Sequence, residues 1–202
     1  MKKNLWLFDF DGTITTADTL LAFIRHACGS VRFVAGFVLF SPLLVLMKLH
    51  LYPNYKAKQC LFSWYFKGMT EAEFNARCCA FAANSKHLLR PMAMRLIQQC
   101  LDKGEQVCIV SASIDNWVRP FFHGISDGAQ LQPIVVGTQV EVQSGMLTGR
   151  FLTKNCYGAE KVRRIEALFP DRNDYHISAF GDSRGDKEML DYADERHYRP
   201  FR

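Results

Sequence analysis

Three short apolar runs along the chain predict buried strands. They extend from Asn4 to Phe8, from Gln106 to Val110 and from Tyr175 to Phe180. Each run is only five or six residues long, and polar or glycine residues follow it directly. Short, nearly continuous apolar runs with such boundaries are typical of strands that are buried on both faces of a sheet.

The second and third runs each follow a helical pattern. The first pattern covers about Pro91 to Lys103 and ends at Gly104, and the other covers Gly158 to Phe169 and ends at Pro170. This alternation predicts an α/β fold, a Rossmann-like parallel sheet with helices on both faces. Ligands of such sheets bind beyond the carboxyl ends of the strands, where this chain places its polar clusters.

The segment after the first strand has a different character. Between about Thr15 and Lys86 the pattern is mostly helical and gives no clear strand signal. We therefore expect a helical cap at 15–86, inserted into a core domain made of 1–14 and 87–202. An insert of this length beside the catalytic edge of a sheet is typical of a lid over a site.

The cap contains an apolar run, Phe33 to Met47, that holds no charged residue. At fifteen residues it is shorter than the roughly 20 that a membrane-spanning helix needs. We expect Gly36, Ser41 and Pro42 to kink or split it. Two readings stay open, a buried helical hairpin of the lid or a segment that dips into a membrane interface. A true span is the least favoured reading.

Later in the chain, Pro133 to Val142 alternates like a strand, and Gly145 to Phe151 reads as a turn and a second strand. We expect these segments to form a β-hairpin that projects from the core.

Composition restricts the class of protein. The hydrophobic content of 49% and charged content of 22% are ordinary for a folded globular protein. The formal charge of +5 comes from scattered basic residues without an RNA-binding aromatic motif, so we expect no nucleic-acid partner. Seven cysteines without metal-ligand spacing indicate reduced thiols. No secretory pattern is visible, so the expected location is the cytoplasm, with 33–47 as the candidate for a peripheral membrane contact.

The first candidate catalytic residues follow the first predicted strand, in the segment Asp9-Phe10-Asp11-Gly12-Thr13. Two carboxylates two residues apart repel each other, and each raises the pKa of the other unless a cation or a proton lies between them. Turn formation alone also accounts for Asp and Gly at this position. Further polar groups at the other strand ends decide between the two readings.

Three such groups follow in chain order. Ser111-Ala112-Ser113 ends the second strand, Lys161 lies in the first turn of the later helix, and Gly181-Asp182-Ser183-Arg184-Gly185-Asp186 ends the third strand. With the first motif, they resemble the haloacid dehalogenase-like hydrolase superfamily over nearly the whole chain. The helical insert resembles the phosphoserine phosphatase-like branch, in which the cap follows the first strand.

The residue types suit phosphoryl transfer, which needs a nucleophile, neutralised oxygen charge and a proton for the leaving group. Asp9 is the candidate nucleophile, which would form an aspartyl-phosphate, and Asp11 is the candidate general acid and base. The expected cofactor is Mg²⁺, which prefers oxygen ligands. The resemblance implies Asp9, Asp182 and the main-chain carbonyl of Asp11 as its ligands, with Gly12 and Thr13 as supporting residues of the motif.

The phosphoryl group of the substrate needs its own donors. Ser111 would donate its hydroxyl, and the backbone N–H of Ala112 would lie alongside. Lys161 would neutralise the phosphate as a point charge. Asp186 would support the metal or orient Lys161.

The cap bears on the substrate. Phosphoserine phosphatases place an acidic residue nine positions after the nucleophile, and this chain has Asp18 there. They also use a cap arginine for the substrate carboxylate, but no arginine lies between Arg32 and Arg77 here. The apolar cap resembles that of bacterial phosphatases that act on phosphatidylglycerophosphate.

We therefore expect a Mg²⁺-dependent phosphatase for a small-molecule or lipid phosphomonoester. A phosphoserine phosphatase or a phosphotransferase is the alternative. A dehalogenase would need neither Asp11 nor Mg²⁺, and a non-catalytic membrane adaptor would not need a complete set of catalytic residues. Both are remote alternatives.

Overall fold

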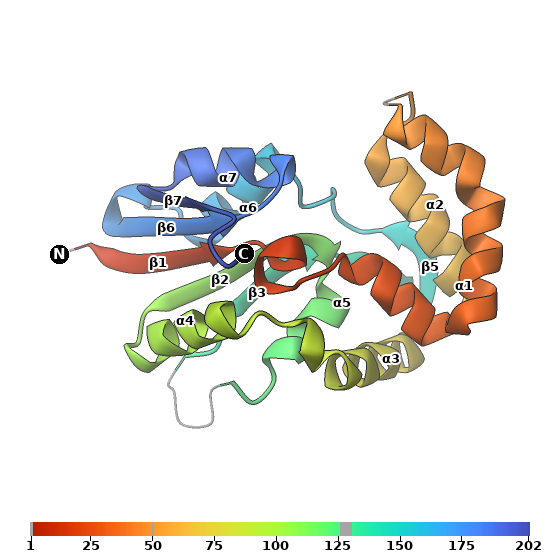
Figure 1. Cartoon of the computed structure of the whole chain (residues 1–202), viewed down its shortest axis with the longest axis horizontal. Helices are drawn as coiled ribbons and strands as arrows, with labels where there is room; N and C mark the ends of the chain where they lie inside the picture. The colour runs from red at the N-terminus through yellow and green to blue at the C-terminus, as the bar shows by residue number, and fades with distance from the viewer. Residues whose placement is uncertain (1, 50, 126–130) are drawn as a thin grey trace.

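The computed structural model describes residues 2–49, 51–125 and 131–202. At its centre is a five-stranded parallel sheet with the strand order β3-β2-β1-β6-β7. Its strands are β1 (Lys3–Phe8), β2 (Gln106–Ile114), β3 (Ile134–Thr138), β6 (Tyr175–Gly181) and β7 (Glu195–Tyr198). Figure 1 shows β1 running from the N-terminus toward the cap helices, so the carboxyl ends of the parallel strands face the cap. The predicted α/β class is confirmed.

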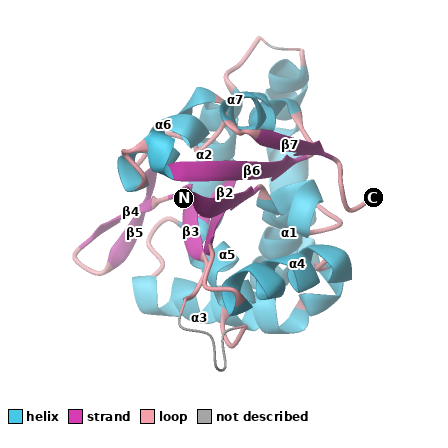
Figure 2. Ribbon diagram, turned by 90° about the vertical axis from the view of Figure 1, so that its left-hand side faces the viewer, coloured by secondary structure: helices cyan, strands magenta, loops and turns pink. Residues whose placement is uncertain are grey.

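Helices cover both faces of the sheet (Figure 2). The helices are α1 (Thr19–Lys48), α2 (Asn54–Phe66), α3 (Glu71–Asn84), α4 (Pro91–Asp102), α5 (Asp115–Val118), α6 (Ala159–Leu168) and α7 (Lys187–Tyr192). Leu5 and Leu7 of β1 pack with Ile165 of α6 and Met189 of α7. Phe8 lies in the other hydrophobic cluster, with residues of α4 and α5. Successive side chains of a strand point to opposite faces of the sheet. Because both faces are covered, the strand has to be apolar at nearly every position.

The cap consists of α1, α2 and α3, which lie in chain order between β1 and α4 (Figure 1). The two segments that enter and leave it run side by side. Thr16 N donates to Leu88 O at 2.8 Å, and Arg90 N donates to Ile14 O at 2.8 Å. These helices fill the interval that the sequence assigns to the cap, 15–86, while the division into two domains stays a prediction.

The base of the cap shares one aromatic core with the domain below it. Phe23 of α1 stacks on Trp117 of α5 with ring centroids 4.8 Å apart. Phe81 of α3 meets Phe121 edge to face at 5.6 Å. Since these rings are buried together, the lower part of the cap is packed onto the core. The part of the cap that projects is the outer half of α1 with the adjoining half of α2.

The predicted break in the apolar run 33–47 is wrong. Helix α1 changes direction earlier, at Gly29, whose φ of 78° lies in the left-handed region that favours glycine. The helix then continues through Gly36, Ser41 and Pro42. Pro42 has no N–H for the carbonyl of Val38, but the hydroxyl of Ser41 donates to that carbonyl at 2.8 Å. The proline is therefore tolerated inside the helix.

The predicted hairpin exists, but its first segment also supplies a strand of the main sheet. Residues Ile134–Thr138 pair with β2 as β3, and the hairpin is formed by β4 (Val140–Gln143) and β5 (Met146–Phe151). The hairpin packs on the cap, where Phe151 N donates to the side chain of Gln59 at 3.1 Å. Strand β7 was not predicted, because Glu195–Tyr198 is a partly exposed edge strand with mostly polar residues.

Candidate active site

A cavity of about 770 Å³ lies between the carboxyl ends of the strands and the cap. Its floor includes Asp9, Asp11 and Lys161 from the core. Its walls include apolar side chains from the cap, among them Phe37 and Leu44 of α1. The fold thus brings the predicted catalytic carboxylates to the one edge of the sheet that the cap covers.

Lys161 is the buried centre of the site. Its ammonium group donates to Asp9 Oδ1, Asp186 Oδ1 and the carbonyl of Val110, each at 2.6 Å. These three bonds use all three of its N–H groups. Lys161 therefore links the loops after β1 and β6 to β2, and its charge lies directly beside the candidate nucleophile.

Burial and charge act against each other in this group. Burial raises the pKa of Asp9 to about 8; the Lys161 ammonium opposes this rise, and the negative charge of Asp186 adds to it. Burial would lower the pKa of Lys161, but the carboxylates of Asp9 and Asp186 hold it above its usual value. One ammonium thus does not balance the negative charge that surrounds Asp9, and a bound cation would do so.

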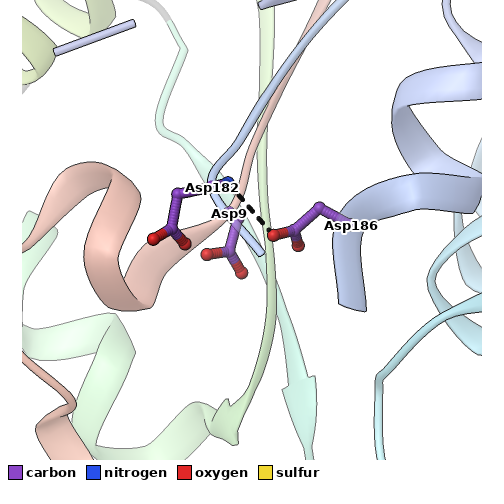
Figure 3. A group of neighbouring side chains, drawn as sticks. All are labelled: Asp9, Asp182 and Asp186. Atoms are coloured by element: carbon purple, nitrogen blue, oxygen red, sulfur yellow. Dashed lines mark hydrogen bonds between the residues drawn. The ribbon is translucent and has the colours of Figure 1, made fainter. Parts of the chain in front are cut away.

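Three carboxylates could hold that cation. Asp9, Asp182 and Asp186 carry oxygens that all lie within 4.8 Å of one another, and Figure 3 shows the three side chains pointing toward a common centre. A Cβ atom at Gly12 would lie 2.5 Å from Asp182 Oδ2, so only glycine leaves room for this carboxylate. Carboxylate oxygens are the donors that Mg²⁺ prefers, so the residues present fit this ion.

Asp186 is less available to a metal than the other two. Its Oδ1 accepts from Lys161, and its Oδ2 accepts from the hydroxyl of Ser183 at 2.8 Å and from the backbone N–H groups of Ser183 and Asp182. Of the two roles that the sequence allowed, this geometry favours the orientation of Lys161. Asp182 forms an ion pair with Arg202, a contact that no sequence motif indicated.

The carboxylate of Asp11 is held by side chains that sequence reasoning missed. Its Oδ1 accepts from the backbone N–H of Thr19 at 2.7 Å and from the Thr19 hydroxyl at 2.5 Å. Its Oδ2 accepts from the Ser113 hydroxyl at 2.5 Å. The indole N–H of Trp117 donates to the Thr19 hydroxyl at 3.2 Å, which orients that hydroxyl toward Asp11. Asp11 is thereby fixed at the floor of the cavity, which suits the predicted role of general acid and base.

We expect Ser113→Ala to lower kcat about tenfold with little change in KM, because Asp11 loses one of the hydrogen bonds that fix it. Steady-state kinetics on an aryl phosphate measures this change. Ser178→Ala is the matched control, because Ser178 is a buried strand serine that bonds to Glu195 instead. An unchanged kcat for Ser113→Ala would show that this bond does not position the proton-transfer group.

The segment expected to bind phosphate differs from its prediction in one respect. Strand β2 continues to Ile114, so Ser111 lies within the strand, fully buried, and its oxygen accepts from Ser113 N at 3.0 Å. Ala112 and Ser113 line the cavity, whereas Ser111 is not among its lining residues. Ser111 thus holds the end of β2, where Ala112 and Ser113 face the cavity.

Several further side chains define the cap side of the cavity. Asp18 lines it and accepts from Leu20 N at 2.9 Å, so this carboxylate also caps the start of α1. Lys58 of α2 reaches across to the carbonyl of Ala112 at 2.5 Å, and burial lowers its pKa. Asn155 and Tyr157 line the opposite wall. Lys58 lies in the stretch between Arg32 and Arg77 that contains no arginine, so a lysine supplies a cation on the cap side of the cavity.

The buried hydroxyl of Thr13 has no hydrogen-bond partner within the described parts of the chain. A buried hydroxyl normally has one, and a partner is absent most often where a ligand, ion or water supplies it. This hydroxyl belongs to the same motif as Asp9 and Asp11, and its supporting role stays a prediction.

The chain belongs to the haloacid dehalogenase-like hydrolases, since the model of that family matches residues 6–191. It is therefore a hydrolase of this class. Among curated proteins it is similar to protein CicA of Caulobacter vibrioides, with 36% identity over 198 residues, 96% of this chain and 85% of that protein.

Solved structures share the fold. A protein of unknown function from Bordetella pertussis Tohama I superposes with a TM-score of 0.80 at 18% identity, covering 95% of this chain and 87% of that one. A phosphoserine phosphatase, solved as a phospho-aspartyl intermediate analogue, superposes with a TM-score of 0.58 at 20% identity, covering 96% and 84% of the two chains. The relationship to phosphoserine phosphatase-like members was predicted from the helical cap.

Proposed function

We propose that this protein is a Mg²⁺-dependent phosphatase that hydrolyses phosphomonoesters through an aspartyl-phosphate on Asp9. The observation that carries this proposal is the arrangement around Asp9. One of its oxygens is held by the Lys161 ammonium, two further carboxylates lie within metal-ligand reach, and Asp11 lines the same cavity. These are the parts that in-line phosphoryl transfer requires.

In the proposed reaction, Asp9 attacks phosphorus with the oxygen that Lys161 does not hold, and the bond between phosphorus and the ester oxygen breaks. Asp11 gives its proton to the departing oxygen and then takes a proton from the water that attacks the aspartyl-phosphate. The bond between Asp9 and phosphorus breaks as the water attacks, inorganic phosphate leaves, Asp9 is again a carboxylate and Asp11 again carries its proton. A magnesium ion held by Asp9 and Asp182 would supply positive charge for the phosphoryl oxygens.

The positioning of each group follows from its contacts. Ser113 and Thr19 donate hydrogen bonds to Asp11 and hold its carboxyl group in one orientation. Lys161 stays in place because Asp186 and the Val110 carbonyl both accept hydrogen bonds from it. These residues are held in position before the substrate binds, so little reorganisation accompanies the reaction.

The proposed substrate is a phosphomonoester with an apolar part, either a small molecule or a lipid phosphate. The support for it is the cap wall of the cavity, where Phe37, Leu44, Val45 and Met47 follow one another along α1. Apolar walls of this kind bind hydrocarbon by removing it from water. A phosphoserine substrate is the second candidate, because Asp18 and Lys58 in the same cavity offer an acid for an amine and a cation for a carboxylate.

The purified protein is expected to release inorganic phosphate from an aryl phosphate in the presence of Mg²⁺, to lose this activity with a chelator and to regain it when Mg²⁺ is restored. The dependence follows from the uncompensated carboxylates around Asp9. Equal turnover with and without the chelator would contradict the metal requirement. A panel of phosphoserine, sugar phosphates and lipid phosphates then ranks the substrates, and assay of phosphorylated alcohols detects transfer to acceptors other than water.

A further inference from the structure

The outer part of the cap, residues 30–49 and 51–56, exposes an apolar surface to solvent. We name this part the outer hairpin. An 18-residue window of α1 has a mean hydropathy of 2.0, but only 6% of its residues are buried. Its exposed large apolar side chains are Val31 (87%), Val34, Val38 (69%), Leu39, Val45, Leu46, Leu49, Leu51 (72%) and Tyr55. A helix of a soluble domain normally buries its apolar side, so a continuous exposed surface of this kind marks a contact with something apolar.

The charge around this surface is of one sign. Residues 19–70 contain six Lys and Arg and no Asp or Glu, whereas the rest of the chain carries 19 basic and 20 acidic residues. The exposed cations Lys48 and Lys56 lie at the tip of the outer hairpin, beside the exposed apolar residues Leu49 and Leu51. Apolar side chains bordered by cations are the combination that binds an anionic membrane surface.

The contacts of α1 with α2 indicate how such a contact would be made. Tyr65 Oη donates to Phe33 O at 2.8 Å, and a Cβ atom at Gly36 would lie 2.1 Å from that hydroxyl. Arg32 donates to the carbonyl of Tyr65 at 3.2 Å. A bilayer-spanning α1 would have to break this packing, whereas a contact along its outward face leaves it intact. A second copy of the chain is a less favourable partner for this surface, because it would place two cationic surfaces against each other.

The apolar surface also continues into the cavity. Phe37, Ser41, Leu44 and Lys48, at helical spacing on α1, line the cavity, and Val45 both lines it and is exposed. The outward face of the outer hairpin and the cavity wall are thus neighbouring faces of one helix. A bilayer that contacts the outward face would therefore place its lipid headgroups close to the cavity.

We propose that the outer hairpin docks in the interface of an anionic phospholipid bilayer and presents the cavity to phosphomonoesters at the membrane surface. The docking is inferred from the exposed apolar side chains and the cations of the outer hairpin. The inference that docking brings substrate to the cavity rests on the proposed phosphatase function. The protein is then a peripheral membrane protein whose cap serves both as the wall of its active site and as its membrane contact.

Flotation with vesicles tests the docking. The whole protein should float with vesicles of equimolar phosphatidylcholine and phosphatidylglycerol, and much less with phosphatidylcholine alone or at high salt, because Lys48 and Lys56 act through screened charge. The double variant Val34→Ser/Val38→Ser should lower this partitioning about tenfold or more, since two exposed apolar side chains no longer enter the interface. Leu168→Ser, an equally simple change of an exposed apolar residue on α6, should leave it unchanged.

Hydrolysis of a soluble aryl phosphate separates the docking from the proposed reaction. Val34 and Val38 do not line the cavity, so the double variant should keep this activity although it no longer binds the vesicles. Protein that stays unbound with both kinds of vesicle would overturn the docking. A dimer that Val34→Ser/Val38→Ser dissociates, without vesicle binding, would overturn it in favour of a second copy. Flotation of a protein that hydrolyses no phosphomonoester would uphold the docking and remove the phosphatase assignment.

Discussion

Asp9→Asn is expected to abolish hydrolysis of an aryl phosphate, with a loss in kcat of at least about 10⁴-fold, as for removal of other enzyme nucleophiles. The amide has nearly the shape of the carboxylate, but it is a far weaker nucleophile and a poorer metal ligand. Single-turnover rapid quench should also show that the wild-type protein, and not the variant, carries an acid-stable phosphoryl group that hydroxylamine removes.

The fold should survive this change. Asparagine keeps an oxygen for the Lys161 ammonium and removes a negative charge that burial disfavours. The melting temperature of Asp9→Asn is therefore expected to stay close to that of Asp171→Asn, a control at an exposed aspartate far from the cavity. Turnover in Asp9→Asn close to the wild-type value would exclude Asp9 as the nucleophile.

Lys161→Met should reduce both activity and stability. The variant keeps an unbranched side chain but leaves Asp9 and Asp186 without their shared cation, and loss of one partner of a buried ion pair costs about 3–5 kcal/mol. The phosphoryl group also loses its positive neighbour, for which we expect a fall in kcat of about 10²- to 10³-fold. Thermal unfolding and steady-state kinetics measure the two effects separately.

Lys103→Met is the control, because Lys103 is exposed beyond the end of α4 and bonds to no carboxylate of the site. Saturating Mg²⁺ should restore part of the stability of Lys161→Met, since a cation near Asp9 replaces some of the missing charge. It should not restore kcat, because Lys161 also holds the orientation of Asp9. A Lys161→Met variant with the kinetic constants of the control would remove this lysine from the reaction.

The strands that carry the site could be predicted from sequence, and the physical reason is their burial. A strand covered on both faces has to be apolar throughout, so β1, β2 and β6 each appear as a distinct run with chemistry at the end. Asp9 and Asp182 follow such runs directly. Lys161 was predicted only through the set of motifs that resembles the family, because a lone lysine in the first turn of a helix is otherwise typical of a solvated position.

Other parts of the site gave no such signal. Thr19 lies eight residues after Asp11, and Ser113 lies 102 residues after it; their hydrogen bonds to Asp11 depend on how the cap and β2 meet in space. Strand β7 has the composition of a surface segment because only one of its edges is paired. The solvent exposure of residues 33–47 could not be predicted either, because hydropathy does not distinguish a buried apolar helix from one whose apolar side chains face solvent.

The aromatic core shared by Phe23, Phe81, Trp117 and Phe121 has a consequence for how the molecule opens. A cap joined to the core by packed aromatic rings is expected to unfold together with that core as one cooperative unit, and not to swing away as a rigid lid. Amide hydrogen exchange should then be equally slow in α3 and in β1, and faster only beyond the bend at Gly29. Substrate would then enter and leave through local unfolding of the outer hairpin. Any molecule that contacts the outer hairpin could change the rate of this exchange without a change at the catalytic residues.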